Sequence, residues 1–276
     1  MNNVRGMHLA AATGLVCFCA VSVYGQSTIK VRPYVIDYDS IVVHDGVEKI
    51  VGHTTESRRG DGATHSVFYP APTHPDTPNP KGEIVFRRVD FTDGISAMIV
   101  EEIHAKSTVC KPKADVSRQN KADFFDRTGP DCSSKEGARE TMEGTDTLFG
   151  YSAVRFSQLT GKDRATQEAA LSRVVFWMLP DFNCVEVQDF SQVRASKTDE
   201  WKTTQGNRLT SIKATEPDPA LFTDWLNYDE MKPSDIVRRE MALRCKDVDP
   251  CQMPNTPNGS DASYEKWHAN VKEHEK

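Results

Sequence analysis

Residues 47–69, VEKIVGHTTESRRGDGATHSVFY, decide the fold class of this chain. Two runs rich in β-branched residues flank the sequence GDG at positions 60–62. Glycine and aspartate supply the backbone conformations of a tight turn, so the stretch predicts a β-hairpin. A second hairpin is predicted where the runs 83–90 and 95–103 flank FTDG at positions 91–94.

The second half of the chain continues the β pattern. The run from Leu171 to Leu179 is almost wholly apolar and predicts a central strand that is covered on both faces. A turn is expected at Gln205-Gly206. Sequential hairpins predict a mainly β protein, with an antiparallel curved sheet (a half-barrel or open barrel) and one or two helices. The remaining predicted strands are Thr145–Phe156, Cys184–Val193, Thr198–Thr204 and Asn207–Ala214.

Two helices are predicted, at Arg164–Leu171 and Ser234–Arg244. The second has the better signals, because a proline precedes Ser234, which can cap the helix, and Arg244 near its end suits the helix dipole. The stretch Pro70–Pro80 holds five prolines and predicts an extended loop. Residues Lys111–Asp131 are polar and show neither helix nor strand periodicity, so a long loop is expected there.

Length and charge limit the classes of protein. The chain has 276 residues, with 40 acidic and 34 basic side chains, a formal net charge of -6. This balance argues against a broad nucleic-acid-binding surface, so no nucleic acid partner is expected. With 38% hydrophobic and 27% charged residues, the chain is too polar for a multi-span membrane protein and too apolar for a disordered one. We expect one β-rich domain over 26–252 and a mobile polar tail over 253–276.

Residues 1–25 have the pattern of a secretory signal peptide. Arg5 is followed by an apolar run from Leu9 to Val23, which is shorter than the roughly 20 residues that a bilayer span needs. Cleavage before Gln26 is predicted, and a buried N-terminal helix or an uncleaved anchor are the alternatives. No other stretch approaches membrane-spanning length, so the expected protein is exported, periplasmic or extracellular, without a stable membrane span after signal removal.

Five cysteines follow the predicted leader, which fits export to an oxidising compartment. Loop lengths predict disulfides between Cys110 and Cys132 and between Cys245 and Cys251. Cys184 is then expected to be reduced and buried, since no local motif makes it a nucleophile. Zinc is disfavoured, because the part after the leader has no Cys-x-x-Cys pair and its histidines are scattered.

The sequence predicts no catalytic residues, no metal site and no cofactor, and the ligand-binding residues are unknown. The tripeptide Arg59-Gly60-Asp61 also spells an adhesion motif, but a hairpin turn favours the same residues. His53 and His65 lie on the two arms of the first hairpin, where a two-residue turn would place them on opposite faces. A longer turn would place them on one face but several residues apart. Glu101 and Glu102 are adjacent, so on a strand they would face opposite ways.

The second half resembles a group of uncharacterised exported bacterial proteins. The shared pattern is W-x-x-P-x-x-x-C at Trp177–Cys184, then E-P-x-P-x-x-F at Glu216–Phe222, then Tyr228 and Pro233-Ser234. The match covers roughly residues 145–237, with a looser likeness around Arg87-Arg88, and it implies no known chemistry. This chain departs from the group in its 70–80 loop and in the stretches bounded by the two predicted cysteine pairs. A fainter likeness, based on strand order and export, is to periplasmic lipoprotein-carrier half-barrels.

The functional prediction is an exported, non-catalytic binding or interaction protein whose candidate ligand is apolar, lipid-like or an envelope component. The alternative is a secreted hydrolase with an unidentified active site. Apolar side chains on the predicted strands would form either the ligand surface or simply the core. These side chains are Ile84, Phe86, Met98, Val154, Phe156, Val175 and Trp177.

Overall fold

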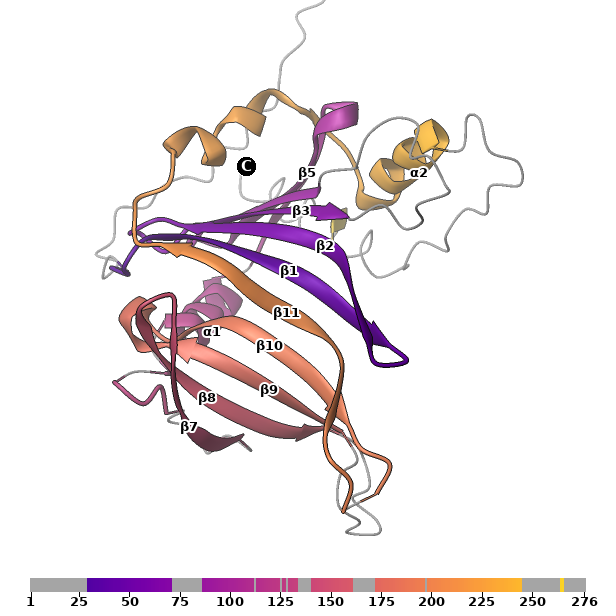
Figure 1. Ribbon diagram of the computed structural model, residues 1–276. Helices are drawn as coiled ribbons and strands as arrows, with labels where there is room; N and C mark the ends of the chain where they lie inside the picture. Colours follow the sequence, from indigo (N-terminus) through magenta and orange to yellow (C-terminus); the bar gives the residue numbers. More distant parts are fainter. Residues whose placement is uncertain are drawn as a thin grey trace, which may run out of the picture.

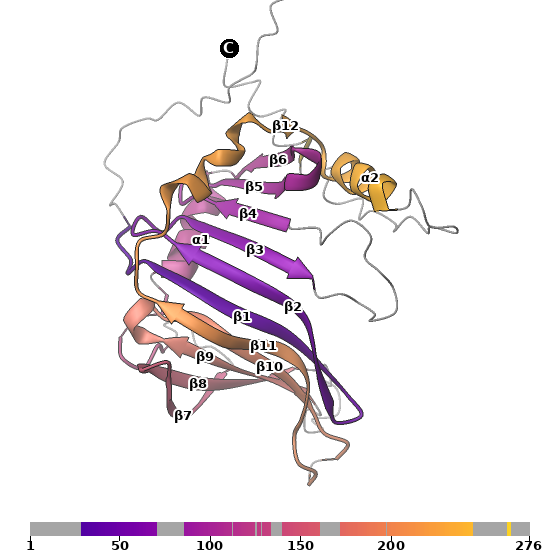
Figure 2. The same ribbon diagram turned by 45° about the horizontal axis from the view of Figure 1, so that its top comes forward.

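The computed structural model describes residues 29–70, 86–111, 113–124, 126–127, 129–133, 140–160, 172–196, 198–244 and 264–265. These residues form one 12-stranded sheet in the order β12-β6-β5-β4-β3-β2-β1-β11-β10-β9-β8-β7. Neighbouring strands are antiparallel except for the short pair β12 and β6. The sheet curves strongly without closing into a barrel (Figures 1 and 2). The predicted class, a mainly β curved open sheet with few helices, is confirmed.

Two meanders make up the sheet. The first six strands follow one another along the chain, as do the next five, and β11 pairs with β1 to join the two series. The first series is β1 Tyr34–His44, β2 Val47–Arg58, β3 Thr64–Pro70, β4 Phe86–Asp90, β5 Ile95–Val100 and β6 Ala105–Cys110. The second is β7 Glu140–Leu148, β8 Tyr151–Thr160, β9 Ser172–Leu179, β10 Val185–Val193 and β11 Lys202–Lys213, and β12 is Asp229–Glu230.

Both predicted hairpins of the first meander are confirmed. Strands β2 and β3 pair from Arg58 opposite Thr64, and Gly62 in the turn has a φ of 87°. Strands β4 and β5 pair in the same way around a turn in which Gly94 has a φ of 97°. Such positive φ values favour glycine, which is why these sequences mark turns.

Two strand predictions in the second meander were wrong. Thr145–Phe156 is not one strand, because the chain turns at Phe149-Gly150 between β7 and β8. Gln205-Gly206 is not a turn but lies inside the continuous strand β11. A Cβ at Gly206 would lie 2.1 Å from the carbonyl oxygen of Asp189 on β10, so this glycine permits a close approach of two strands.

Gly206→Ala is therefore expected to lower the free energy of unfolding by about 1–3 kcal/mol, because the new methyl group collides with backbone that cannot rotate away. Gly60→Ala is the matched control, since a Cβ there has no neighbour closer than 3.5 Å. Urea denaturation of the two variants measures the difference. Equal midpoints would show that β10 and β11 are not this close.

Helix α2, Pro233–Arg244, confirms the predicted C-terminal helix. Helix α1, Lys113–Phe124, lies where a loop was expected. Its surface is mostly polar, so it lacks a clear apolar stripe, and tertiary contacts stabilise it instead. Val116 packs against Gly94, and the Asn120 side chain donates a hydrogen bond to the carbonyl of Thr92 (2.8 Å). The predicted helix Arg164–Leu171 lies outside the described residues.

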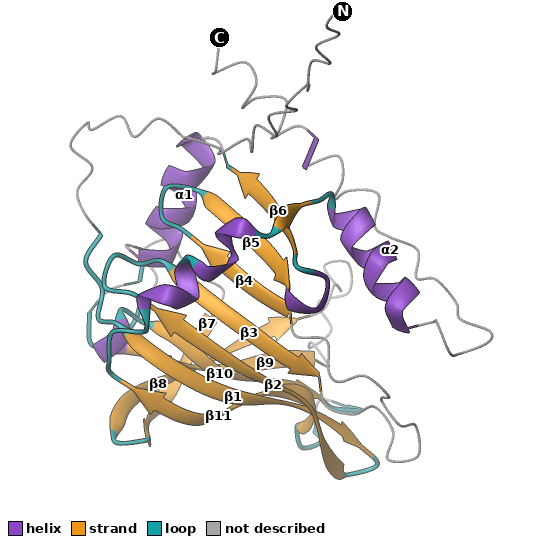
Figure 3. Cartoon of the chain, turned by 90° about the horizontal axis from the view of Figure 1, so that it is seen from above, coloured by secondary structure: helices purple, strands orange, loops and turns teal. Residues whose placement is uncertain are grey.

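Two elements cover opposite faces of β4 and β5. Helix α1 lies beside Asp90 and Ser96, whereas the 3-10 turns η3 (Pro219–Phe222) and η4 (Asp224–Asn227) pack on Val89 and Ala97. Because side chains alternate along a strand, these contacts are on different faces. We call the α1 side, toward which the sheet curves, the inner face and the other side the outer face (Figures 1 and 3). Among the helices in the described ranges, none is long and apolar enough to cross a bilayer.

The disulfide prediction needs a correction. Cys132 bonds to Cys184, with the two Cα atoms 5.5 Å apart, so the predicted Cys110–Cys132 bridge and the reduced state of Cys184 were wrong. The expectation that Cys184 is buried holds. Spacing along the sequence favoured the nearer cysteine, but residues 129–133 fold over β8 and β9 beside the start of β10. Cys245 and Cys251 lie outside the described residues.

Candidate binding surface on the inner face

A buried polar group lies on the inner face where β1 begins and β2 ends, beside the apolar core cluster of Ile36, Phe182 and Leu209. The hydroxyl of Tyr34 on β1 donates a hydrogen bond of 2.5 Å to Glu56 on β2. The guanidinium of Arg58 lies 4.6 Å from the centre of the Tyr34 ring and donates to the carbonyl of Phe182. Burial raises the pKa of Glu56, and burial together with the Glu56 charge raises the pKa of Tyr34 and of Tyr38. The two phenols are therefore neutral donors beside a carboxyl group for which ionisation is unfavourable.

A row of polar side chains continues from this group across the sheet. Ser40, Asn207 and Asp189 are in register on β1, β11 and β10. The Ser40 hydroxyl donates to the Asn207 side-chain oxygen (2.8 Å), and the Asn207 amide donates to Asp189 (2.7 Å). The row lies on the same face as Tyr38, whose pKa the Asp189 charge also raises. The middle of the curved sheet is thus lined by hydrogen-bonding groups.

Glu186 is an uncompensated carboxyl group on this face. It lies on β10 opposite Met178, and its side chain is exposed to solvent. Burial, then the Asp189 charge, raises its pKa to about 7, against the opposing effect of Arg127. Arg127 itself donates to both carboxylate oxygens of Glu140 (2.5 Å each). Within the described residues Glu186 makes no hydrogen bond or ion pair, which leaves it available to a ligand.

The raised pKa of Glu186 predicts how the stability of the fold changes with pH. The folded-state pKa of Glu186 is above its unfolded value of 4.5, so the folded state binds the proton more tightly. Stability is therefore lost as the pH rises from about 4.5 to about 7. Glu186→Gln, which stays neutral, should match the wild type in urea midpoint at pH 4 and exceed it at pH 8. Equal midpoints at both pH values would contradict the raised pKa.

One end of the inner face is apolar and is already filled by the chain. Phe156 and Phe176 stack with ring centres 5.6 Å apart, and both are buried. Val154, Met178 and the Cys132–Cys184 disulfide complete this cluster. Arg127 lies 5.7 Å above the Phe156 ring. This part of the inner face therefore acts as core and does not present an open surface.

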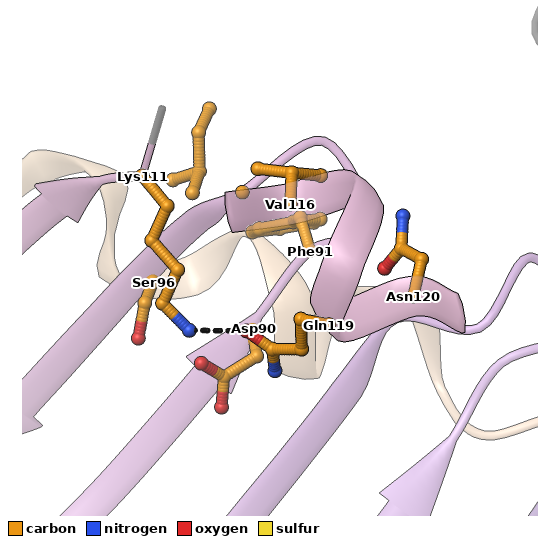
Figure 4. A pocket seen from close by; sticks show the side chains of 9 residues that line it. Asp90, Phe91, Ser96, Lys111, Val116, Gln119 and Asn120 are labelled. Carbon is orange, nitrogen blue, oxygen red and sulfur yellow. Dashed lines mark hydrogen bonds between the residues drawn. The ribbon is translucent and has the colours of Figure 1, made fainter. Parts of the chain in front are cut away.

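A small pocket lies between α1 and the strands β4 and β5 (Figure 4). It encloses no more than about 250 Å³, less than is usual for sites that hold drug-sized ligands. Lys111 donates to the side-chain oxygen of Gln119 (2.5 Å), and Asp90 accepts two hydrogen bonds from Arg88 (2.6 and 2.9 Å). Phe91 and Val116 add apolar walls. The polar groups that line the pocket are thus bonded to protein.

The apolar side chains that the sequence suggested as ligand surface or core lie in different parts of the structure. Met98, Val154 and Phe156 are on the inner face. Val175 and Trp177 alternate along β9 with the residues that pair with Val154 and Phe156. The Trp177 indole donates to Asp146 (2.7 Å), and its ring packs against the core cluster that contains Tyr34, Ile36 and Leu179. Ile84 and the side chain of Phe86 lie outside the described residues. Sequence reasoning missed Glu56, Glu186 and Asp189, because a polar residue in a strand gives no local signal about the face on which it lies.

The histidines and the Arg-Gly-Asp turn have structural partners. His53 and His65 are on the same outer face, because the turn is longer than two residues, and they lie several residues apart along the strands. His53 pairs with Asp39 (3.0 Å). Arg59 forms an ion pair with Asp61 within its turn. A group of three or more His, Cys, Asp or Glu side chains placed to bind a metal does not occur in the described ranges.

The residues that carry the sequence resemblance have structural roles in the fold. Cys184 is in the disulfide, and Phe222 is buried in the outer-face core. Asp218 caps the turn η3 through the backbone N–H of Ala220 (2.9 Å). Glu216 accepts hydrogen bonds of 3.3 Å from the backbone N–H of Gly60. The 216–222 part of the pattern therefore fastens the segment 216–228 to the outer face, whereas Cys184 belongs to the cluster that fills one end of the inner face.

Comparisons with known proteins give no family. No family model matches the chain, and no curated protein does. Among solved structures, a DUF1329 family protein from Desulfovibrio piger has 9% identity and covers 70% of this chain and 90% of its own, with a TM-score of 0.27. LprF from Mycobacterium bovis has 10% identity, with coverages of 69% and 90% and a TM-score of 0.27.

A third solved structure, a putative outer membrane lipoprotein-sorting protein domain from Vibrio parahaemolyticus, has 8% identity. It covers 70% of this chain and 91% of its own, again with a TM-score of 0.27. Its description names the class of carrier to which the sequence has a faint likeness. At such scores the likenesses carry no argument, so the function has to be inferred from the residues.

Proposed function

We propose that this chain is an exported, non-catalytic binding or interaction protein whose binding surface is the inner face of the curved sheet. The observation that carries the proposal is the uncompensated carboxyl group of Glu186 beside the polar row of Asp189 and Asn207. Glu186 is exposed to solvent, and Asp189 and Asn207 are half-buried, so a ligand can reach all three side chains. A carboxyl group whose pKa is strongly raised by its surroundings is typical of a functional surface.

The ligand that fits this surface is amphipathic and lipid-like. Its polar group would lie against Glu186, Asp189 and the hydroxyl of Tyr38. Its acyl part would extend along partly buried apolar side chains of the same face, Phe68 on β3 and Met98 on β5. A purely apolar ligand fits less well, because the apolar part of the inner face around Phe156 and Phe176 is filled by Arg127 and the Cys132–Cys184 disulfide.

Native mass spectrometry of gently purified protein, followed by solvent extraction, tests the proposal. We expect a bound species a few hundred daltons heavier than the mature chain, which extraction removes and identifies as an acyl compound. The inner-face double variant Glu186→Gln/Asp189→Asn should lose most of it. The matched outer-face variant Asp37→Asn should retain it, since Asp37 bonds Thr55 and Ser211 on the other side of the sheet. Equal loading of the two variants would contradict the proposal.

Export stays a prediction, because residues 1–25 lie outside the described part of the chain. N-terminal sequencing of protein recovered from the cell exterior or envelope should give Gln26 as the first residue. A chain that begins at Met1 or Asn2 would contradict signal removal. The Cys132–Cys184 disulfide supports export, because such bonds persist in oxidising compartments.

A further inference from the structure

Exposed apolar side chains gather at one end of the sheet. Strand β1 ends there, β2 and β11 begin there, and β8 and β10 end there. The described residues include eleven large apolar side chains that are exposed. Six of them lie at this end, which we call the hairpin rim. They are Val42, Val47, Ile50, Val51, Leu159 and Val193.

The most exposed of these side chains lie on parts of the chain that project. Val47 is 70% exposed and Ile50 50% exposed, both in the β1–β2 hairpin, and Leu159 at the end of β8 is 61% exposed. The β1–β2 and β10–β11 hairpins extend in the same general direction (Figures 1 and 2). Exposed aliphatic side chains that project together from neighbouring strand ends are candidates for an interaction site.

The charge of the two hairpins indicates the kind of partner. Residues 42–51 and 193–202 together hold four acidic and four basic side chains, a formal net charge of zero in a chain of net charge -6. Glu48 is further neutralised by Arg208, with two bonds of 2.6 and 2.5 Å. The guanidinium groups of Arg173 and Arg194 lie 4.7 and 4.4 Å from the centre of the Trp201 ring. Aliphatic tips backed by an aromatic ring and basic side chains suit the boundary between acyl chains and headgroups.

We propose that the hairpin rim docks on a zwitterionic lipid surface, with Val47 and Ile50 inserted among the acyl chains. The balanced charge complements headgroups that are themselves neutral overall, and it gives no attraction to a strongly anionic surface. Separate projecting side chains suit a fluid bilayer, whereas a protein partner would need a continuous matching surface. The docking is independent of any ligand on the inner face.

Cosedimentation of the mature chain with phosphatidylcholine vesicles tests this proposal. We expect binding that changes little between low and high salt, because burial of apolar surface drives it. The double variant Val47→Thr/Ile50→Thr keeps strand-forming residues and should bind at least tenfold more weakly. The control Leu226→Gln/Leu243→Gln removes exposed leucines away from the hairpin rim and should bind like the wild type.

Three outcomes would overturn the proposal, provided that both variants keep the wild-type urea midpoint. They are no binding to phosphatidylcholine, binding that requires anionic lipid and low salt, and equal binding by the rim variant and the control. Sedimentation velocity without lipid distinguishes a further case. A dimer that the rim variant abolishes, without vesicle binding, would assign the surface to a second copy of the chain.

Discussion

Replacing Arg87 by methionine is expected to lower the free energy of unfolding by about 3 kcal/mol. The Arg87 side chain is 9% exposed and forms ion pairs with Glu101 on η1 (Glu101–Ile103) and with Asp224 on η4 (2.7 Å). It also donates to the carbonyl of Leu221 (3.2 Å) and to the imidazole of His65 (3.1 Å). This one side chain therefore fastens the segment 216–228 to the sheet. Removing one partner of a buried ion pair typically lowers the free energy of unfolding by about 3–5 kcal/mol. We expect a value near the lower limit here, because the carboxylates of Glu101 and Asp224 are both partly exposed.

Arg88 is the matched control for this prediction. It is the next residue on β4, points to the inner face and is 58% exposed in its pair with Asp90. Arg88→Met should change the free energy of unfolding by less than about 1 kcal/mol. Urea denaturation measures both variants. Burial and the Arg87 charge lower the pKa of His65 to about 4, so nuclear magnetic resonance should find this pKa raised in Arg87→Met. Similar losses in the two variants would contradict the assigned role.

Removing the disulfide with Cys132→Ser/Cys184→Ser is expected to lower the free energy of unfolding by about 4 kcal/mol. The bridge spans 52 residues of sequence, so its loss frees a long loop in the unfolded chain. The single variant Cys184→Ser should be destabilised to a similar extent. Peptide mapping without reductant gives a direct check. A peptide that links Cys132 to Cys110 would contradict the structure and restore the pairing that loop length favoured.

The sequence predicted the elements that local signals specify. Turn residues at 60–62 and 91–94 marked two hairpins, and Pro233 marked the start of α2. Ser234, which was expected to cap this helix, lies inside it, because α2 already begins at Pro233. Strand β1 was missed although a local signal marks it, since Asp45-Gly46, with φ values of 51° and 77°, forms the two-residue turn that joins β1 to β2. Helix α1 was missed because it has no apolar stripe of its own and rests on β4 and β5. Gly206 misled the prediction, because glycine serves both turns and close strand contacts.

Little of the candidate site could be predicted from the sequence. The inner face contains Glu56, Asp189 and Glu186, which lie on two strands and come together only through the β1–β11 pairing. A register shift between Glu186 and Gln188 also changes which side chains share a face. Cys184 could not be paired by spacing, since its partner is 52 residues away and another cysteine is nearer to that partner in sequence.

Photo-crosslinking tests the central claim, that the inner face binds the ligand, most directly. The extracted protein would be loaded with a diazirine-bearing phospholipid below the concentration at which vesicles form, irradiated and digested for mass spectrometry. We expect attachment at inner-face side chains such as Tyr38, Phe68 and Met98, with loss of labelling in Glu186→Gln/Asp189→Asn. Labels confined to outer-face positions such as His53 or Asp39, or to the hairpin rim, would contradict binding at the inner face.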